Sequence, residues 1–208
     1  MLKTNIVQIS AILLFLFNIE AAIAITAASC DACHATAVRQ ATQAPQLAGQ
    51  SASYLKKQLL QFQQDERGGA AADVGGQQMA AMAKTLTEAQ VAELSQFYSK
   101  QKPDSASANN GAANSNSNAN QLDQGRRLYI GSCGACHGAK AEGNPALHAP
   151  ALFLLDNRYL QLQLKHFRDG VRGVTKTDKP GRQMALMSRQ LSDTDIQAVA
   201  AYISAGAQ

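Results

Sequence analysis

Apolar residues recur at helical spacing in two separate parts of the chain, between residues 54 and 62 and between residues 159 and 167. Positions three and four apart share one face of a helix, so each part predicts an amphipathic helix. The apolar members are Tyr54, Leu55, Leu59 and Phe62 in the first part, and Tyr159, Leu160, Leu164 and Phe167 in the second.

A capping signature starts a later helix in each part. Thr87 is followed three residues later by Gln90, and Ser192 by Asp195. Such pairs satisfy the free backbone amides at a helix start. Apolar residues continue at helical spacing behind both caps: Val91, Leu94 and Phe97, then Ile196, Val199 and Tyr202. Another helix is predicted over residues 122–129, where Gly125 would allow close contact with the terminal helix.

These landmarks repeat with a constant offset of 105 residues, so that Pro45 corresponds to Pro150 and Arg67 to Arg172. A repeat of this kind indicates a duplicated unit. We therefore predict two copies of one small domain, over residues 25–102 and 121–208. Residues 103–120 lie between them and are rich in Asn, Ser and Ala without apolar periodicity, which predicts a flexible linker.

The first 24 residues have the layout of a secretory signal, with Lys3, an apolar run over residues 6–17 and an Ala22-Ile23-Ala24 cleavage site. This predicts export to the periplasm. Two alternatives remain open. The segment could be retained as a membrane anchor, or Cys30 could be a lipid-modified residue.

Composition favours an all-α fold, because the 208-residue chain has no tryptophan and few aromatic residues and is rich in alanine and glutamine. The formal net charge is +4. Its scattered distribution, with an excess in the second half, suits docking on an acidic protein surface and not binding to nucleic acid, which would need a dense basic stripe.

All four cysteines lie in two C-x-x-C-H words, Cys30-Cys33-His34 and Cys133-Cys136-His137. This pattern is typical of haem held by two thioethers, with the histidine as proximal iron ligand. The alternatives are weaker. A thiol-redox site expects a βαβ setting, a shared zinc site would have to join two domains across the linker, and a disulfide across two residues stabilises little. We predict two covalently bound haem c groups.

Each copy has a pair of methionines that could supply the second axial ligand. Met79 and Met184 lie eight residues before the caps, in a Gly-, Gln- and Ala-rich stretch that we predict to be a loop over the iron. Met82 and Met187 lie closer to the terminal helix, where methionine more often packs as an apolar side chain. We therefore favour Met79 and Met184.

The order of these features resembles the class I cytochromes c, and the stretch "PQLAGQSASYLKKQLLQF" carries the likeness most clearly. The duplication in one exported chain is similar to the dihaem cytochrome c4 family. The resemblance implies two tandem all-α domains, His/Met ligation of both irons (His34 with Met79, His137 with Met184), and haem edges that approach across the domain interface.

The chain departs from the family pattern in three places. Cleavage after Ala24 would leave no helix ahead of Cys30. The first domain would then either pack against a neighbouring domain or protein, or use the uncleaved leader as its first helix. The second copy has "PALFLLDNRYL" in place of a Gly-Gln turn, and Ala35 follows His34 where glycine is usual.

Four further polar side chains are weaker candidates for binding. Arg67 and Arg172 could hold haem propionates through charge-assisted hydrogen bonds, or could be solvated arginines that follow a helix. His148 and His166 have no histidine counterpart in the first copy, and we expect them to be surface or core residues.

With both axial positions filled, we expect an electron carrier and not an enzyme. Its partners would be redox proteins such as a membrane oxidase or a dehydrogenase, with electrons passing towards a terminal oxidase or another high-potential acceptor. The alternatives are a cytochrome subunit of a periplasmic dehydrogenase complex, a haem peroxidase and a haem-based sensor.

Overall fold

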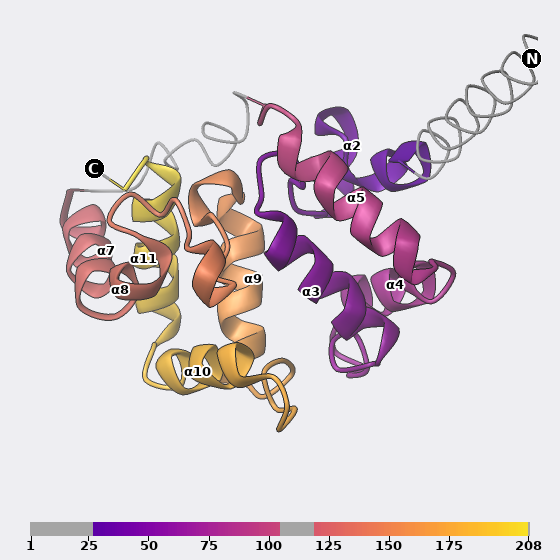
Figure 1. Ribbon diagram of the computed structural model, residues 1–208. Helices are drawn as coiled ribbons and strands as arrows, with labels where there is room; N and C mark the ends of the chain where they lie inside the picture. The colour runs from indigo at the N-terminus through magenta and orange to yellow at the C-terminus, as the bar shows by residue number, and fades with distance from the viewer. Residues whose placement is uncertain (1–26, 105–118, 208) are drawn as a thin grey trace, which may run out of the picture.

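The computed structural model describes residues 27–104 and 119–207, and the predicted leader over residues 1–24 lies outside them. The described residues form two helical domains placed side by side (Figure 1). Their only β geometry is an isolated antiparallel bridge between Asn144 and Ala149. In the same residues, no helix has the length and apolar character needed to cross a membrane. The predicted all-α fold is confirmed.

The first domain is built from short helices around α3. Residues 27–34 are helical and carry the first C-x-x-C-H word. The helices that follow are α2 (Thr36–Thr42), α3 (Ala52–Gln63), α4 (Val74–Ala83) and α5 (Glu88–Lys100). Helix α5 packs against α3. The Tyr98 hydroxyl of α5 donates to the Ala27 carbonyl at 3.1 Å and to the Asp31 carboxylate at 2.8 Å. Tyr98 thus ties the first word to the terminal helix of its domain.

The second domain repeats this plan, and a helix precedes its C-x-x-C-H word. It contains α7 (Ala119–Ser132), α8 (Gly134–His137), the 3-10 turns η1 (Pro145–Leu147) and η2 (Leu152–Leu154), α9 (Asn157–Arg168), α10 (Lys179–Ser188) and α11 (Asp193–Ser204). The predicted helix ahead of the second word is therefore present. It begins at Ala119, two residues before the expected domain boundary.

Both predicted capping boxes are present. The Thr87 hydroxyl accepts from the Gln90 amide at 3.2 Å, and the Ser192 hydroxyl accepts from the Asp195 amide at 3.1 Å. Behind Ser192, α11 buries Ile196, Val199 and other apolar residues in the core of the second domain. Gly125 of α7 lies against this helix so closely that a Cβ added there would meet the Ala198 carbonyl. The expected close packing of α7 on α11 is confirmed.

The two domains meet through equivalent helices, since α3 of the first copy lies beside α9 of the second (Figure 1). The buried Gln50 side chain pairs with both backbone groups of Ala151, donating to the carbonyl at 2.7 Å and accepting from the amide at 3.0 Å. Lys57 forms an ion pair with Asp178 at 2.7 Å.

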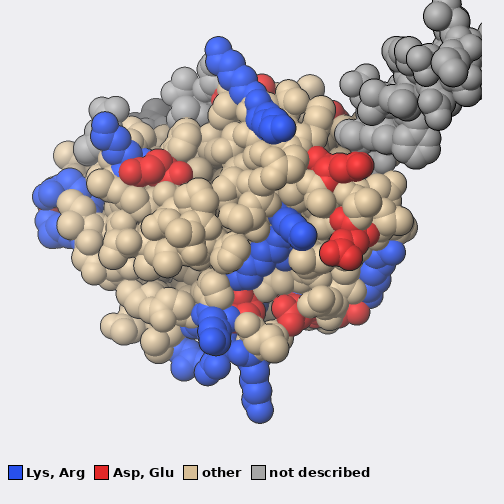
Figure 2. Space-filling view, viewed as in Figure 1, with Lys and Arg blue, Asp and Glu red and all other residues tan. Residues whose placement is uncertain are grey.

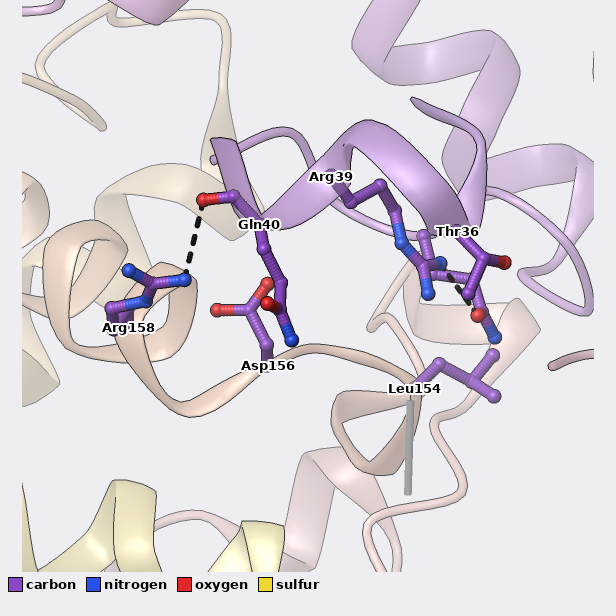
Figure 3. Close-up of a pocket in the computed structure, with 7 residues that line it drawn as sticks. Thr36, Arg39, Gln40, Leu154, Asp156 and Arg158 are labelled. Atoms are coloured by element: carbon purple, nitrogen blue, oxygen red, sulfur yellow. Dashed lines mark hydrogen bonds between the residues drawn. The ribbon is translucent and has the colours of Figure 1, made fainter. Parts of the chain in front are cut away.

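The interface also holds a small hollow between α2 and the start of α9 (Figure 3). The Arg158 guanidinium donates to the Gln40 carbonyl across it at 3.3 Å. Its volume of about 20 Å³ is room for about one water molecule. The contact surface is therefore polar and closely packed.

Candidate haem sites

The four cysteines occupy matching positions in the two domains. Cys30 and Cys33 are three residues apart on the helix over residues 27–34, so both thiols lie on one helical face. Cys133 and Cys136 have the same spacing at α8. In each pair the first cysteine is half-buried and the second is exposed, and all four thiols are free.

Burial disfavours the thiolate form of the first cysteine in each pair. It raises the pKa of the Cys30 thiol, and it raises the pKa of the Cys133 thiol to about 11. Thiol-redox enzymes need a lowered thiol pKa, because the thiolate is the nucleophile. Cys30 and Cys133 are therefore poorly suited to act as the redox nucleophile, and each pair presents two free thiols on one helical face as attachment points.

Each histidine is held by the carbonyl of an equivalent proline. His34 Nδ1 lies 2.7 Å from the Pro45 carbonyl oxygen, and His137 Nδ1 lies 3.0 Å from that of Pro150. A carbonyl can only accept, so Nδ1 carries the proton and Nε2 keeps its lone pair. Burial lowers the pKa of both imidazoles below the usual value, which keeps them neutral at pH 7.

This arrangement is the one expected of metal-binding histidine. A ligating imidazole commonly donates its other N–H to a carbonyl, which fixes both the tautomer and the ring orientation. The same bond forms in both copies although the two prolines stand at different distances along the chain, 11 and 13 residues after the histidine. The residues of both words therefore fit an iron porphyrin held by two thioethers and one imidazole.

The methionines lie in helices and not in the predicted loop. Met79 is in α4 and Met184 is in α10. Asp73 and Asp178 begin these helices, each carboxylate accepting from a glycine amide three residues on, at 2.9 and 3.0 Å. The loop prediction was wrong because it overlooked these caps.

The two methionines of the first copy differ in burial. Met79 is half-buried and packs against the cluster of Phe62, Ala80 and Ala83, whereas Met82 is 47% exposed. In the second copy both Met184 and Met187 are half-buried.

The two arginines are buried at the domain interface, so the alternative of a solvated arginine after a helix is wrong. Arg67 donates to Gln58 at 2.7 Å and, across the interface, to the Tyr159 hydroxyl at 2.8 Å and to Gln163 at 3.1 Å. Arg172 donates to Gln163 at 2.7 Å and, across the interface, to Gln58 at 2.6 Å. Each arginine thus binds the equivalent glutamine of both copies.

Each guanidinium also makes a cation–π contact with an aromatic ring of its own domain. The guanidinium carbon lies 4.5 Å from the ring centroid of Phe62 for Arg67, and 4.5 Å from that of Phe167 for Arg172. Within the described residues neither guanidinium has a carboxylate partner, and the Arg67 Nε has no hydrogen-bond acceptor. Two positive charges are therefore buried together without a carboxylate in direct contact among the described residues, and the nearest compensating charge is the buried Asp73 beside Arg67.

The two remaining histidines have different surroundings. His148 is exposed. His166 is buried on α9 at the interface, where its Nδ1 lies 3.8 Å from an Asp73 carboxylate oxygen. Both expectations, a surface or a core histidine, are met.

Comparison with known proteins identifies the family. The cytochrome c profile matches residues 19–102 and again residues 122–206. Cytochrome c4 of Azotobacter vinelandii is 30% identical over 188 residues, covering 85% of this chain and 84% of that protein. The chain belongs to the cytochrome c4 family. It is a dihaem electron-transfer cytochrome with two covalently bound haem c groups, and each domain carries one C-x-x-C-H word.

Two other proteins similar to this chain extend the comparison. The thiosulfate dehydrogenase electron acceptor of Thiomonas intermedia (strain K12) is 34% identical over 183 residues, which cover 86% of this chain and 79% of that protein. The crystal structure of reduced recombinant cytochrome c4 from Pseudomonas stutzeri has a TM-score of 0.65 at 29% identity. The match covers 90% of this chain and 97% of that one. The two-domain architecture is therefore shared along almost the whole chain.

Sequence reasoning missed two tyrosines that hold the haem words of this cytochrome c4. Tyr98 reaches the first word from the terminal helix, whereas Tyr129 reaches the second from the leading helix, donating to the Gly138 carbonyl at 2.6 Å. They are not equivalent in the repeat, since position 203, which corresponds to Tyr98, is isoleucine. No repeat signal could therefore have revealed them.

Proposed function

We propose that a histidine and a methionine fill the two axial positions of each haem iron in this chain, His34 with Met79 and His137 with Met184. The protein then serves only as an electron carrier. The observation that carries the proposal is the matched pair of histidines, each neutral and held through Nδ1 by a proline carbonyl. When bound, the haems supply one-electron redox chemistry. The four side chains leave no ligand position for substrate.

The methionine assignment rests on position and packing. Met79 and Met184 occupy equivalent places in α4 and α10, and the half-buried Met79 is less exposed than Met82. A thioether ligand must be withdrawn from solvent to stay on the iron. In the first copy, the more buried methionine is the better ligand.

A redox titration with the near-infrared band of methionine ligation tests this assignment. Met79→Ala and Met184→Ala should each remove the band from one haem and lower its potential, because a Met ligand raises the potential. Met82→Ala and Met187→Ala are the matched controls and should leave the band intact. Loss of the band in a control variant would assign the ligand to that methionine.

The buried arginines are proposed to hold haem propionates. Two guanidinium groups at 7% and 8% exposure, bound only to neutral oxygens, are costly to bury unless an anion lies beside them. Propionates at the interface would supply that charge. Replacing Arg67 or Arg172 with glutamine should lower the potential of the adjacent haem, because a nearby cation favours the reduced state. An unchanged pair of potentials would reject the contact.

Export and partner choice complete the proposal. The leader pattern supports a periplasmic location, which N-terminal sequencing and mass measurement of the product would check against cleavage after Ala24. Methionine ligation would give potentials suited to passing electrons on to a terminal oxidase or another high-potential acceptor.

A second role is favoured by one relative. The similarity to a thiosulfate dehydrogenase electron acceptor supports service as the acceptor of a periplasmic dehydrogenase. Stopped-flow mixing of the oxidised cytochrome with a thiosulfate dehydrogenase and thiosulfate would test this role. Reduction of both haems within the turnover time of the enzyme would support it, and reduction no faster than by thiosulfate alone would reject it.

A further inference from the structure

A hollow of about 830 Å³ opens on the second domain, between the end of α9 and α10. Figure 2 shows Lys and Arg side chains gathered at this edge of the molecule, over α10. We call this region the α10 hollow. Its basic lining residues are Arg168, Lys176, Lys179, Arg182 and Arg189, and its exposed apolar residues are Val174 and Leu186.

The charge in the α10 hollow is not neutralised by the described chain. Lys176, Lys179, Arg182 and Arg189 are exposed and form no ion pair within the described residues. Asp169 is the one acidic residue in the lining, and it is bound to Arg168 at 2.8 Å. The hollow therefore presents free positive charge around an apolar centre, with Val174 64% and Leu186 54% exposed.

The duplication shows that the fold does not require this chemistry. Helices α4 and α10 have equivalent positions and equivalent aspartate caps. Three of the basic positions nevertheless have uncharged residues in the first copy: Ala71, Val74 and Gln77 stand at the positions of Lys176, Lys179 and Arg182. Lys84 stands at the position of Arg189 and is paired with Asp65. It also has the smaller Gly69 and Ala81 at the positions of Val174 and Leu186. Only the second copy combines the full basic rim with the apolar centre.

We propose that the α10 hollow is the docking site for a redox partner protein whose contact face is acidic around a protruding apolar side chain. This inference deepens the proposed electron-carrier function and rests on it. Interfaces of this kind combine an apolar centre with a polar rim, and complementary charge speeds and orients the encounter. The hollow is concave, which suits a protruding protein segment and not the flat surface of a bilayer. Because α10 also carries Met184, the partner would sit against the helix next to the second haem.

The test uses the holoprotein and a synthetic acidic peptide with two central leucines, Glu-Glu-Leu-Leu-Glu-Glu, labelled for fluorescence anisotropy. One variant returns the rim to the first-copy residues: Lys176→Ala, Lys179→Val and Arg182→Gln. A second returns the apolar centre: Val174→Gly and Leu186→Ala. The control removes the same charge elsewhere: Lys100→Gln, Lys102→Gln and Lys140→Gln, all exposed and without ion pairs within the described residues.

The rim variant should bind the peptide about tenfold more weakly, as expected for three surface ion pairs of about 0.5 kcal/mol each. The apolar-centre variant should also weaken binding, and the control should bind like the wild type. Carbodiimide cross-links from the peptide should map to Lys176 and Lys179. Equal loss in the control, or cross-links elsewhere, would overturn the proposal.

Vesicles of phosphatidylcholine and phosphatidylglycerol test whether the α10 hollow binds a lipid membrane instead of a protein. If the wild type binds these vesicles and the rim and apolar-centre variants do not, the site is a lipid surface and the protein-docking proposal is wrong. Peptide binding does not require electron transfer, and each variant is also titrated for its two haem potentials. A failure of the carrier function would appear in that titration and a failure of the docking site in the binding assay.

Discussion

Replacing Gly125 with alanine tests the contact that orders the second domain. A Cβ at this position would lie 2.6 Å from the Ala198 carbonyl carbon and 2.8 Å from the Tyr202 Cβ. Carbon atoms in contact need about 3.5–4.0 Å, so α7 would have to move about 1 Å away from α11. Such overpacking costs about 1–3 kcal/mol, whereas alanine gains about 0.5–1 kcal/mol of helix propensity over glycine. We expect a net loss of about 1–2 kcal/mol from the free energy of unfolding of this domain.

Gly131 supplies the matched control, because it lies in the same helix and a Cβ there would meet nothing within 4 Å. Gly131→Ala should leave the domain unchanged or stabilise it by up to about 1 kcal/mol. Guanidinium unfolding of the holoprotein, followed by far-UV circular dichroism, compares the two variants. If Gly125→Ala unfolds at the same denaturant concentration as Gly131→Ala, the close packing of α7 on α11 does not stabilise the domain.

Two other substitutions probe the domain interface. Gln50→Ala strips both hydrogen bonds from the buried backbone of Ala151, and each unpaired group costs about 1–3 kcal/mol, so the domains should separate and the radius of gyration in solution scattering should rise. An unchanged radius would contradict this. Burial lowers the pKa of His166, so the unfolded chain binds a proton more readily and stability should be lost as pH falls below about 6.5. The charged groups around His166 are Asp73, which raises its pKa, Arg67 and Arg172, which lower it, and Asp169, which raises it. His166→Gln, which installs the first-copy residue, should remove this pH dependence from denaturant unfolding at pH 5 and 7.5, with a slope no larger than about 1.4 kcal/mol per pH unit. An identical pH profile in the variant would count against it.

Local patterns predicted the elements of each domain well. The caps at Thr87 and Ser192 and the helix through Gly125 all follow from residues within one or two turns of each other. The haem words and their histidines were equally accessible, because their spacing is fixed by the porphyrin they attach. The match of the two copies then extended each conclusion from one domain to the other.

Two features of the site could not be predicted correctly from the sequence. One depends on a helix cap a few residues away, and the other depends on contacts between residues far apart in the sequence. The glycine-rich stretch before Met79 predicts a loop, yet it is helical because Asp73 caps it through the Gly76 amide. For Arg67 the sequence left two interpretations open, a propionate contact and a solvated arginine after a helix, and only the second is excluded, because its partners Tyr159 and Gln163 are more than 90 residues away. Nothing in the local pattern reports which faces of two duplicated domains will be pressed together.

That face-to-face contact between α3 and α9 has a further consequence, because both halves belong to one polypeptide. A tether of this length converts association into an intramolecular step with an effective concentration on the order of millimolar. Polar contacts such as Lys57 with Asp178 then need only a small favourable free energy to keep most molecules closed. A single interface substitution should therefore lower the fraction of time that the two redox centres spend close together, while the two separated domains stay joined in one chain and can meet again.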